Sequence, residues 1–150
     1  MNRDIEFRGK AKDNEWIYGY YHKETSTSIA LQEYGINEIN THYIHTVIDH
    51  LPFKIEVIPE TIGQYTGLKD KNGKKIFEGD ILRTPAWLYG EEKVCICKYN
   101  QENNVNSIIG FGLYTNDAYF KKYQELVECD EWDEFEVIGN IYENKELLEG

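Results

Sequence analysis

Cysteine and proline are both scarce in this chain of 150 residues, which contains three of each. A small, odd number of cysteines does not suit a disulfide framework, and it favours a reducing compartment. So few prolines, beside 12 Tyr, 6 Phe and 3 Trp, exclude the composition of a disordered chain. A chain of this length buries enough surface to hold a core without a disulfide or a metal. We therefore expect a single β-rich domain over residues 1–150.

Long apolar segments are absent as well. No apolar run approaches the ~20 residues that a helix needs to span a membrane. Residues 1–6 lack the apolar segment of a signal peptide. We expect a cytoplasmic protein that does not contact a membrane.

Positive charge is in short supply, since 16 Lys and Arg face 27 Asp and Glu, for a net charge of −11. Residues 76–150 hold nearly all of this excess. Binding to nucleic acid depends on clustered Lys and Arg, so the charge disfavours nucleic acid as a partner. A small basic loop is the local exception, and we interpret it either as a solvated turn or as a contact site. Its candidate binding residues are Lys69, Lys71 and Lys74, with Lys75 beside them.

Alternating apolar residues and turn residues predict about seven short strands. Trp16, Tyr18 and Tyr20 recur at a spacing of two, which places three rings on one face of a strand. Further strands are expected at 43–48, 54–58, 81–84, 92–99, 107–115 and 134–142. Helices are expected at 118–126 and as one turn at 143–148, while 30–40 is either a short helix or irregular. The pattern is typical of a small antiparallel barrel or sandwich, and we expect most of the rings to fill its interior.

Three blocks of the sequence carry a resemblance to a known family. Residues 64–81 read QYTGLKDKNGKKIFEGDI, residues 137–144 read VIGNIYEN, and residues 5–10 read IEFRGK. Together, in this order, they resemble the signatures of the YopX family. That resemblance implies a protein of bacteriophages or of prophages in Gram-positive bacteria, with an SH3-like barrel in a β-rich fold. It implies no known activity, no catalytic residues and no cofactor.

The first block also has a physical interpretation as a pair of turns. The carboxylate of Asp70 can accept hydrogen bonds from nearby backbone, and Gly73 follows an Asn that also tolerates positive φ. Ile76 and Ile81 are expected in a core. Two carboxylates between them are expected to face solvent: Glu78 and Asp80.

Histidine and cysteine offer little for a metal site or a nucleophile. His42 and His45 are three residues apart, so a strand would place them on opposite faces, whereas zinc needs converging ligands. Cys95 and Cys97 share a strand face, and we interpret them as small apolar core residues. We expect no bound metal and no cofactor.

An acidic cluster lies at 128–136. One hypothesis is a cation site, although the run lacks the glycine of a calcium loop. Another is a decoy that mimics nucleic acid and binds a basic groove of a host protein, and a third is a solvated loop. An enzyme using His42, His45 and this cluster is a further alternative. The cluster consists of Glu128, Asp130, Glu131, Asp133, Glu134 and Glu136.

Trp87 and Tyr89 stand in an apolar stretch between two predicted strands. Aromatic residues of this kind are enriched at protein interfaces, so we predict a surface here for a partner or for self-association. With no catalytic constellation in the sequence, we predict a non-enzymatic phage or prophage accessory protein that acts by binding, with a protein partner or a second copy of itself. The sequence leaves a small-molecule ligand open.

Overall fold

The computed structural model describes residues 5–92, 94–100, 110–115 and 134–149. The chain divides into two compact units. The N-terminal unit comprises residues 5–64, and the C-terminal unit comprises residues 65–150 together with residues 1–4. The expectation of a single domain stays a prediction.

The N-terminal unit is a single antiparallel sheet. Its strands are β1 (Phe7–Lys10), β2 (Trp16–Ser26), β3 (Ile39–Ile48), β4 (Leu51–Glu56) and the beginning of β5 (Gly63–Lys69). The order across the sheet is β4-β3-β2-β1-β5. A short 3-10 turn, η1 (Pro59–Thr61), connects β4 to β5. These strands agree with the predictions for the aromatic segment after residue 15 and for residues 43–48.

Two turns of the N-terminal unit place non-glycine residues at positive φ. Asn14, in the connection between β1 and β2, has φ 75°, a conformation that Asn tolerates better than most residues. Asp49 and His50 have φ 50° and 66°, the combination of a two-residue type I′ hairpin. This second turn joins β3 to β4 and sets Val47 opposite Pro52.

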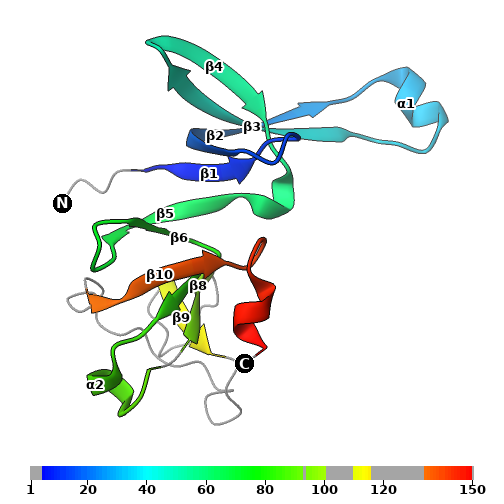
Figure 1. Ribbon diagram of the computed structural model, residues 1–150. Helices are drawn as coiled ribbons and strands as arrows, with labels where there is room; N and C mark the ends of the chain where they lie inside the picture. Colours follow the sequence, from blue (N-terminus) through cyan, green and yellow to red (C-terminus); the bar gives the residue numbers. More distant parts are fainter. Residues whose placement is uncertain (1–4, 93, 101–109, 116–133, 150) are drawn as a thin grey trace. The chain divides into compact units, whose positions relative to one another are not determined.

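Residues 24–40 form an arm of the N-terminal unit. The far ends of β2 and β3 pair with each other from Tyr20–His45 to Ser26–Ile39, and the helix α1 (Ile29–Glu33) lies at the tip. Figure 1 shows this arm extending away from β1 and β4. The hydroxyl of Ser28 caps α1 by accepting a hydrogen bond from the Leu31 N–H at 3.1 Å. The helix ends at Glu33 with Tyr34 as its C-cap, and Gly35 follows with φ 76°.

The C-terminal unit contains a second antiparallel sheet with the order β10-β7-β8-β9. Its strands are β7 (Asp80–Arg83), β8 (Val94–Asn100), β9 (Gly110–Thr115) and β10 (Glu136–Asn140). The rest of β5 pairs with β6 (Lys75–Phe77), α2 (Ala86–Tyr89) follows β7, and the 3-10 turn η4 (Lys145–Leu148) follows β10. The core of this unit is closely packed and includes both predicted core cysteines. Its buried cluster is Ile76, Leu82, Cys95, Cys97 and Phe135.

The carboxylate of Asp70 organises the turn between β5 and β6. One oxygen accepts from the backbone N–H groups of Asn72 and Lys74, each at 2.9 Å, and the other accepts from the N–H of Val137 at 2.9 Å. Asp70 therefore links the Asn-Gly turn to the start of β10, 67 residues away along the chain. The prediction that Asp70 hydrogen-bonds the local backbone is confirmed, and the contact with β10 adds to it.

Several expectations need correction. The described strands form open sheets, because β9 and β10 lie at opposite edges of the C-terminal sheet; the SH3-like barrel is not confirmed. Asp80, expected in solvent, is buried, since its carboxylate accepts from the N–H of Phe77 at 2.8 Å. Tyr18 and Tyr20, expected to fill a barrel, are 43% and 70% exposed. The predicted helix at 118–126 lies outside the described residues.

Replacing Asp70 by Asn tests its role as a link. The side chain keeps its shape, but an amide NH₂ takes the place of one accepting oxygen. At least one backbone N–H then loses its acceptor, so we expect the free energy of unfolding to fall by about 2 kcal/mol in denaturant titration. Asn72→Ala is the matched control, because it keeps all three hydrogen bonds; equal stability of D70N and the unmodified chain would contradict this role.

Candidate functional site

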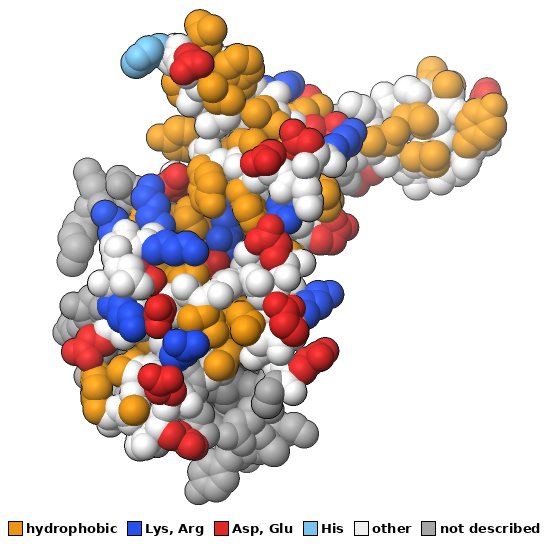
Figure 2. Space-filling view, viewed as in Figure 1, with side chains coloured by type: hydrophobic (Ala, Val, Ile, Leu, Met, Phe, Trp, Pro, Cys, Tyr) orange, Lys and Arg blue, Asp and Glu red, His pale blue; other side chains and the backbone are white. Residues whose placement is uncertain are grey.

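Apolar side chains are distributed very unequally between the two units. Of the thirteen large hydrophobic residues that are exposed among the described residues, twelve lie in the N-terminal unit. Of the twelve hydrophobic residues that are buried, only three lie there: Ala11, Ile44 and Val57. Figure 2 shows exposed hydrophobic side chains along the arm and at the free end of the β3–β4 hairpin. Among the described residues of this unit no second layer packs on the sheet, so much of both its faces stays uncovered, which accounts for this distribution.

A groove lies across β2, β3 and β4 of the N-terminal unit. It has a volume of about 430 Å³, and Tyr18, Tyr20 and Val47 supply its exposed apolar side chains, Val47 being 68% exposed. Phe53 also borders the groove, but its pairing with Thr46 places its side chain on the other face of the sheet. Gly19 lies in the floor, where a Cβ would come within 1.9 Å of the His45 carbonyl oxygen, so only glycine allows β2 and β3 to approach this closely. The remaining lining residues are His45, Thr46, Pro52 and Lys54.

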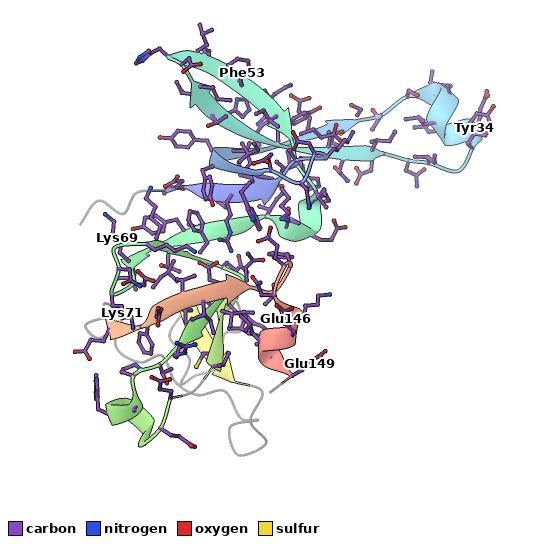
Figure 3. The ribbon with its side chains drawn as sticks, viewed as in Figure 1. Tyr34, Phe53, Lys69, Lys71, Glu146 and Glu149 are labelled. Atoms are coloured by element: carbon purple, nitrogen blue, oxygen red, sulfur yellow. The ribbon has the colours of Figure 1, made fainter. Side chains whose placement is uncertain are left out.

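The tip of the arm carries a second apolar surface. Ile29 and Tyr34 are 80% and 83% exposed, and Ile36 and Ile39 are also exposed. Helix α1 has no buried residue at all. Figure 3 shows Tyr34 at the end of the arm and Phe53 on β4. We name the two surfaces the arm tip (Ile29, Tyr34, Ile36 and Ile39) and the groove (Tyr18, Tyr20 and Val47).

Polar groups on the groove side of β2, β3 and β4 are held by one another. The Lys54 ammonium lies 2.6 Å from a Glu24 carboxylate oxygen and 4.4 Å from the centre of the Tyr43 ring. The rings of His22 and His45 make an edge-to-face contact with centroids 5.4 Å apart. The hydrogen bond from Lys54 lowers the pKa of Glu24, and the same bond raises the pKa of Lys54. Lys54, paired with Glu24, and the neighbouring His45 thus form a polar border to the groove.

The predicted basic loop lies on the turn between β5 and β6. Lys69 and Lys74 are exposed, whereas Lys71 forms an ion pair with Glu136 at 3.0 Å. Figure 3 shows Lys69 and Lys71 at this turn. Since a partner residue of the same chain already neutralises Lys71, the turn presents fewer available cations than the sequence indicates.

Trp87 lies in α2 and is 56% exposed, with its indole N–H donating to a Glu134 carboxylate oxygen at 2.6 Å. The side chain of Tyr89 lies outside the described residues. A cleft of about 220 Å³ next to α2 is lined by Lys71, Glu134 and Glu136 among others. Glu134, which accepts the hydrogen bond from Trp87, therefore lines the same cleft as Lys71. The sequence did not indicate this proximity. Arg83 also pairs with Glu136 at 3.5 Å, so the charges of this cleft largely neutralise each other.

The histidine hypothesis gains no support from the strand that carries it. Both imidazoles lie on β3, where an odd spacing places them on opposite faces. His42 contacts the Tyr21 hydroxyl at 2.8 Å, while His45 contacts His22. Residues 128–133 of the acidic cluster lie outside the described residues, so the decoy and enzyme hypotheses stay predictions. No group of three His, Cys, Asp or Glu within the described ranges is placed to hold a metal ion.

A family model described as YopX protein matches residues 6–149. The chain belongs to the YopX family. The resemblance drawn from the three sequence blocks is thereby confirmed. A crystal structure of protein EF1440 from Enterococcus faecalis is similar to this YopX-family chain, with 24% sequence identity and a TM-score of 0.49. The similarity covers 98% of this chain and 99% of that one. Among curated proteins, none matches the chain.

Helices of the described parts of this YopX-family chain are short. None has the length and apolar character needed to cross a membrane.

The groove border offers a test in the pH dependence of Glu24. Its pKa is lowered in the folded chain, so its contribution to stability is present above the unfolded-state pKa and is lost as the pH falls through the folded-state pKa. Lys54→Met removes the bound ammonium, and we expect the Glu24 pKa to rise towards its ordinary value in an NMR titration of the side-chain carboxyl. Lys12→Met is the control, because it breaks the exposed Lys12–Glu56 pair (2.9 Å) of the same unit instead. An unchanged Glu24 pKa in K54M would refute the assignment.

Proposed function

We propose that this YopX-family protein is a non-enzymatic accessory protein of a phage or prophage, which acts in the bacterial cytoplasm by binding another protein chain through its N-terminal unit. The observation that carries the proposal is the concentration of exposed apolar residues in this unit. Monomeric soluble proteins seldom expose large contiguous apolar patches, and such patches mark interaction sites.

The type of surface supports a protein as the ligand. Tyr18 and Tyr20 on β2, Phe53 on β4 and Tyr34 at the end of α1 are exposed aromatic residues, and Tyr is enriched at protein interfaces. The groove borders on Lys54, and exposed Tyr18, Tyr20 and Val47 line it. An exposed aromatic surface on the face of a sheet suits a protein partner, because aromatic residues are enriched at protein interfaces.

The C-terminal unit supports the proposal by contrast. It buries nine hydrophobic residues and exposes only Trp87 among its described large ones, and the Trp87 indole N–H is already bound by Glu134. Its packing is that of a self-sufficient core. We infer that the C-terminal unit provides stability and the N-terminal unit provides contact.

Site-specific photo-crosslinking in bacterial cells tests the proposal. A benzophenone amino acid in place of Tyr20 or of Tyr34 sits on an exposed apolar surface, so we expect ultraviolet light to produce covalent adducts with a defined protein band. The same residue in place of Lys74, which is exposed on a polar turn of the C-terminal unit, is the matched control. Adducts at position 74 as strong as those at positions 20 and 34, or no adducts at either apolar position, would sink the proposal.

A further inference from the structure

The turn between β5 and β6 carries the one Asn-Gly pair of the sequence, Asn72-Gly73. The backbone nitrogen that follows an asparagine can attack the side-chain amide carbon, and glycine hinders this attack least because it has no Cβ. Asparagine counts among the thermolabile residues of proteins. Both residues are exposed, so water has access to the pair.

The backbone hydrogen bonds of this turn define its geometry. The Gly73 N–H donates to the carbonyl oxygen of Asp70 at 2.9 Å, and Gly73 has φ 77°. The Asp70 N–H donates to the carbonyl oxygen of Lys74 at 2.8 Å. This is the pattern of a three-residue hairpin loop, a type I turn followed by a residue in the left-handed region. Asn72 takes the third position of the type I turn, where ψ is about 0°.

Attack on the side chain of Asn72 needs a different backbone angle. The Gly73 nitrogen has to lie beside Cγ of Asn72, so it must eclipse Cβ about the Cα–C bond. Substituents of a tetrahedral Cα stand about 120° apart, so ψ has to rotate by roughly this angle from the value of a type I turn. The rotated angle lies outside the main allowed regions of an L-residue. The nitrogen must also lose its hydrogen, which is harder while that hydrogen is bound to the Asp70 carbonyl oxygen.

The carboxylate of Asp70 stabilises the closed turn. One of its oxygens accepts two N–H groups of the turn itself, and the other accepts the N–H of Val137, all at 2.9 Å. The Lys71 N–H donates to the carbonyl oxygen of Phe135 at 2.8 Å, so the turn is attached to the start of β10 at two points. Rotation at Asn72 therefore requires several hydrogen bonds to break.

We propose that Asn72 is a deamidation site that the closed turn suppresses, so that the modification occurs in chains whose turn has opened. In the open turn the Gly73 nitrogen bonds to Cγ of Asn72, and the side-chain NH₂ leaves as ammonia with the hydrogen of that nitrogen. Water then breaks one of the two C–N bonds of the succinimide, which leaves aspartate or isoaspartate. The site belongs to the C-terminal unit, and the proposed binding by the N-terminal unit does not depend on it.

The products change the turn permanently. Each places a negative charge at position 72, whose N–H is bound by the Asp70 carboxylate. Isoaspartate also adds one carbon to the main chain inside a three-residue loop, where the hydrogen bonds leave no room for a longer path. A chain whose turn has opened and reacted is therefore expected to close it less stably.

Peptide mass spectrometry of the full chain, incubated at mildly alkaline pH, measures the reaction by the mass increase as OH replaces NH₂. We expect position 72 to react at least about tenfold more slowly in the folded chain than in the same chain unfolded in guanidinium chloride. Asp70→Ala, which introduces no new amide, should speed the reaction of the folded chain by about tenfold or more. Asn72→Ala should show no mass increase in this peptide. Circular dichroism verifies the fold of each variant.

Leu82→Ala is the matched control for a general loss of stability. It removes a buried side chain of the same unit and leaves the hydrogen bonds of the turn in place, so we expect it to speed deamidation less than D70A. An equal effect of L82A would show that Asn72 reacts through global unfolding and would overturn the role of the turn.

Hydrogen exchange of the Gly73 N–H gives a measure that needs no variant. Exchange and deamidation both require this N–H to leave the Asp70 carbonyl oxygen, so folding should slow deamidation by at least the exchange protection factor of Gly73. Equal deamidation rates in the folded and unfolded chain, a D70A variant that reacts no faster, or a slowing smaller than this protection factor would each contradict the proposal.

Discussion

The N-terminal unit is built on one antiparallel sheet, and within the described residues it has no second layer of secondary structure to cover that sheet. A sheet face becomes dry only when another layer packs against it. Ile44 and Val57 are buried, but most of the large apolar residues of this unit remain exposed because nothing in the unit lies over them. The groove, the arm tip and the proposed mode of action all follow from this constraint.

The C-terminal unit, by contrast, buries its apolar side chains in a core of its own. Its core collects side chains from β6, β7 and β8 together with Phe135, so residues from distant parts of the sequence share one buried cluster. The carboxylate of Asp70 then fixes the turn before β6 to the start of β10 by accepting three backbone N–H groups. One unit of the YopX-family chain is thus held by internal packing, and the other retains surface for contact.

Local signals in the sequence predicted turns and strands better than they predicted which side chains are buried. The Asn72-Gly73 turn, the strand around residues 43–48 and the burial of Cys95 and Cys97 could be predicted, because turn chemistry and strand period are properties of neighbouring residues. The exposure of Tyr18 and Tyr20 could not. A period of two tells which rings share a face, but it does not tell whether another layer covers that face. Asp80 was expected in solvent but is buried. Its carboxylate accepts a hydrogen bond from a backbone N–H, and a sequence pattern does not show where such a donor will lie.

The candidate site was the least predictable part. The sequence pointed to Trp87 and to the basic loop, yet Trp87 and Lys71 are both bound by glutamates of their own unit. The arm and the groove went unrecognised because they depend on pairings between β2, β3 and β4. The connecting turn between β3 and β4 uses Asp49 and His50, and a histidine at positive φ gives no recognisable hairpin signal.

The same hairpin also affects strand addition at the β4 edge of the sheet. In a two-residue hairpin the closing pair, Ile48 and Leu51, exchanges hydrogen bonds, so the next pair, Val47 and Pro52, directs its backbone groups away from the partner strand. The nitrogen of Pro52 therefore faces the outer margin of β4 and has no hydrogen to donate there. A strand arriving from another molecule would meet an interrupted row of donors, which discourages continuous strand addition and open-ended polymerisation. Pro52 thus disfavours strand addition at the β4 edge, while the face of the sheet remains available for contact.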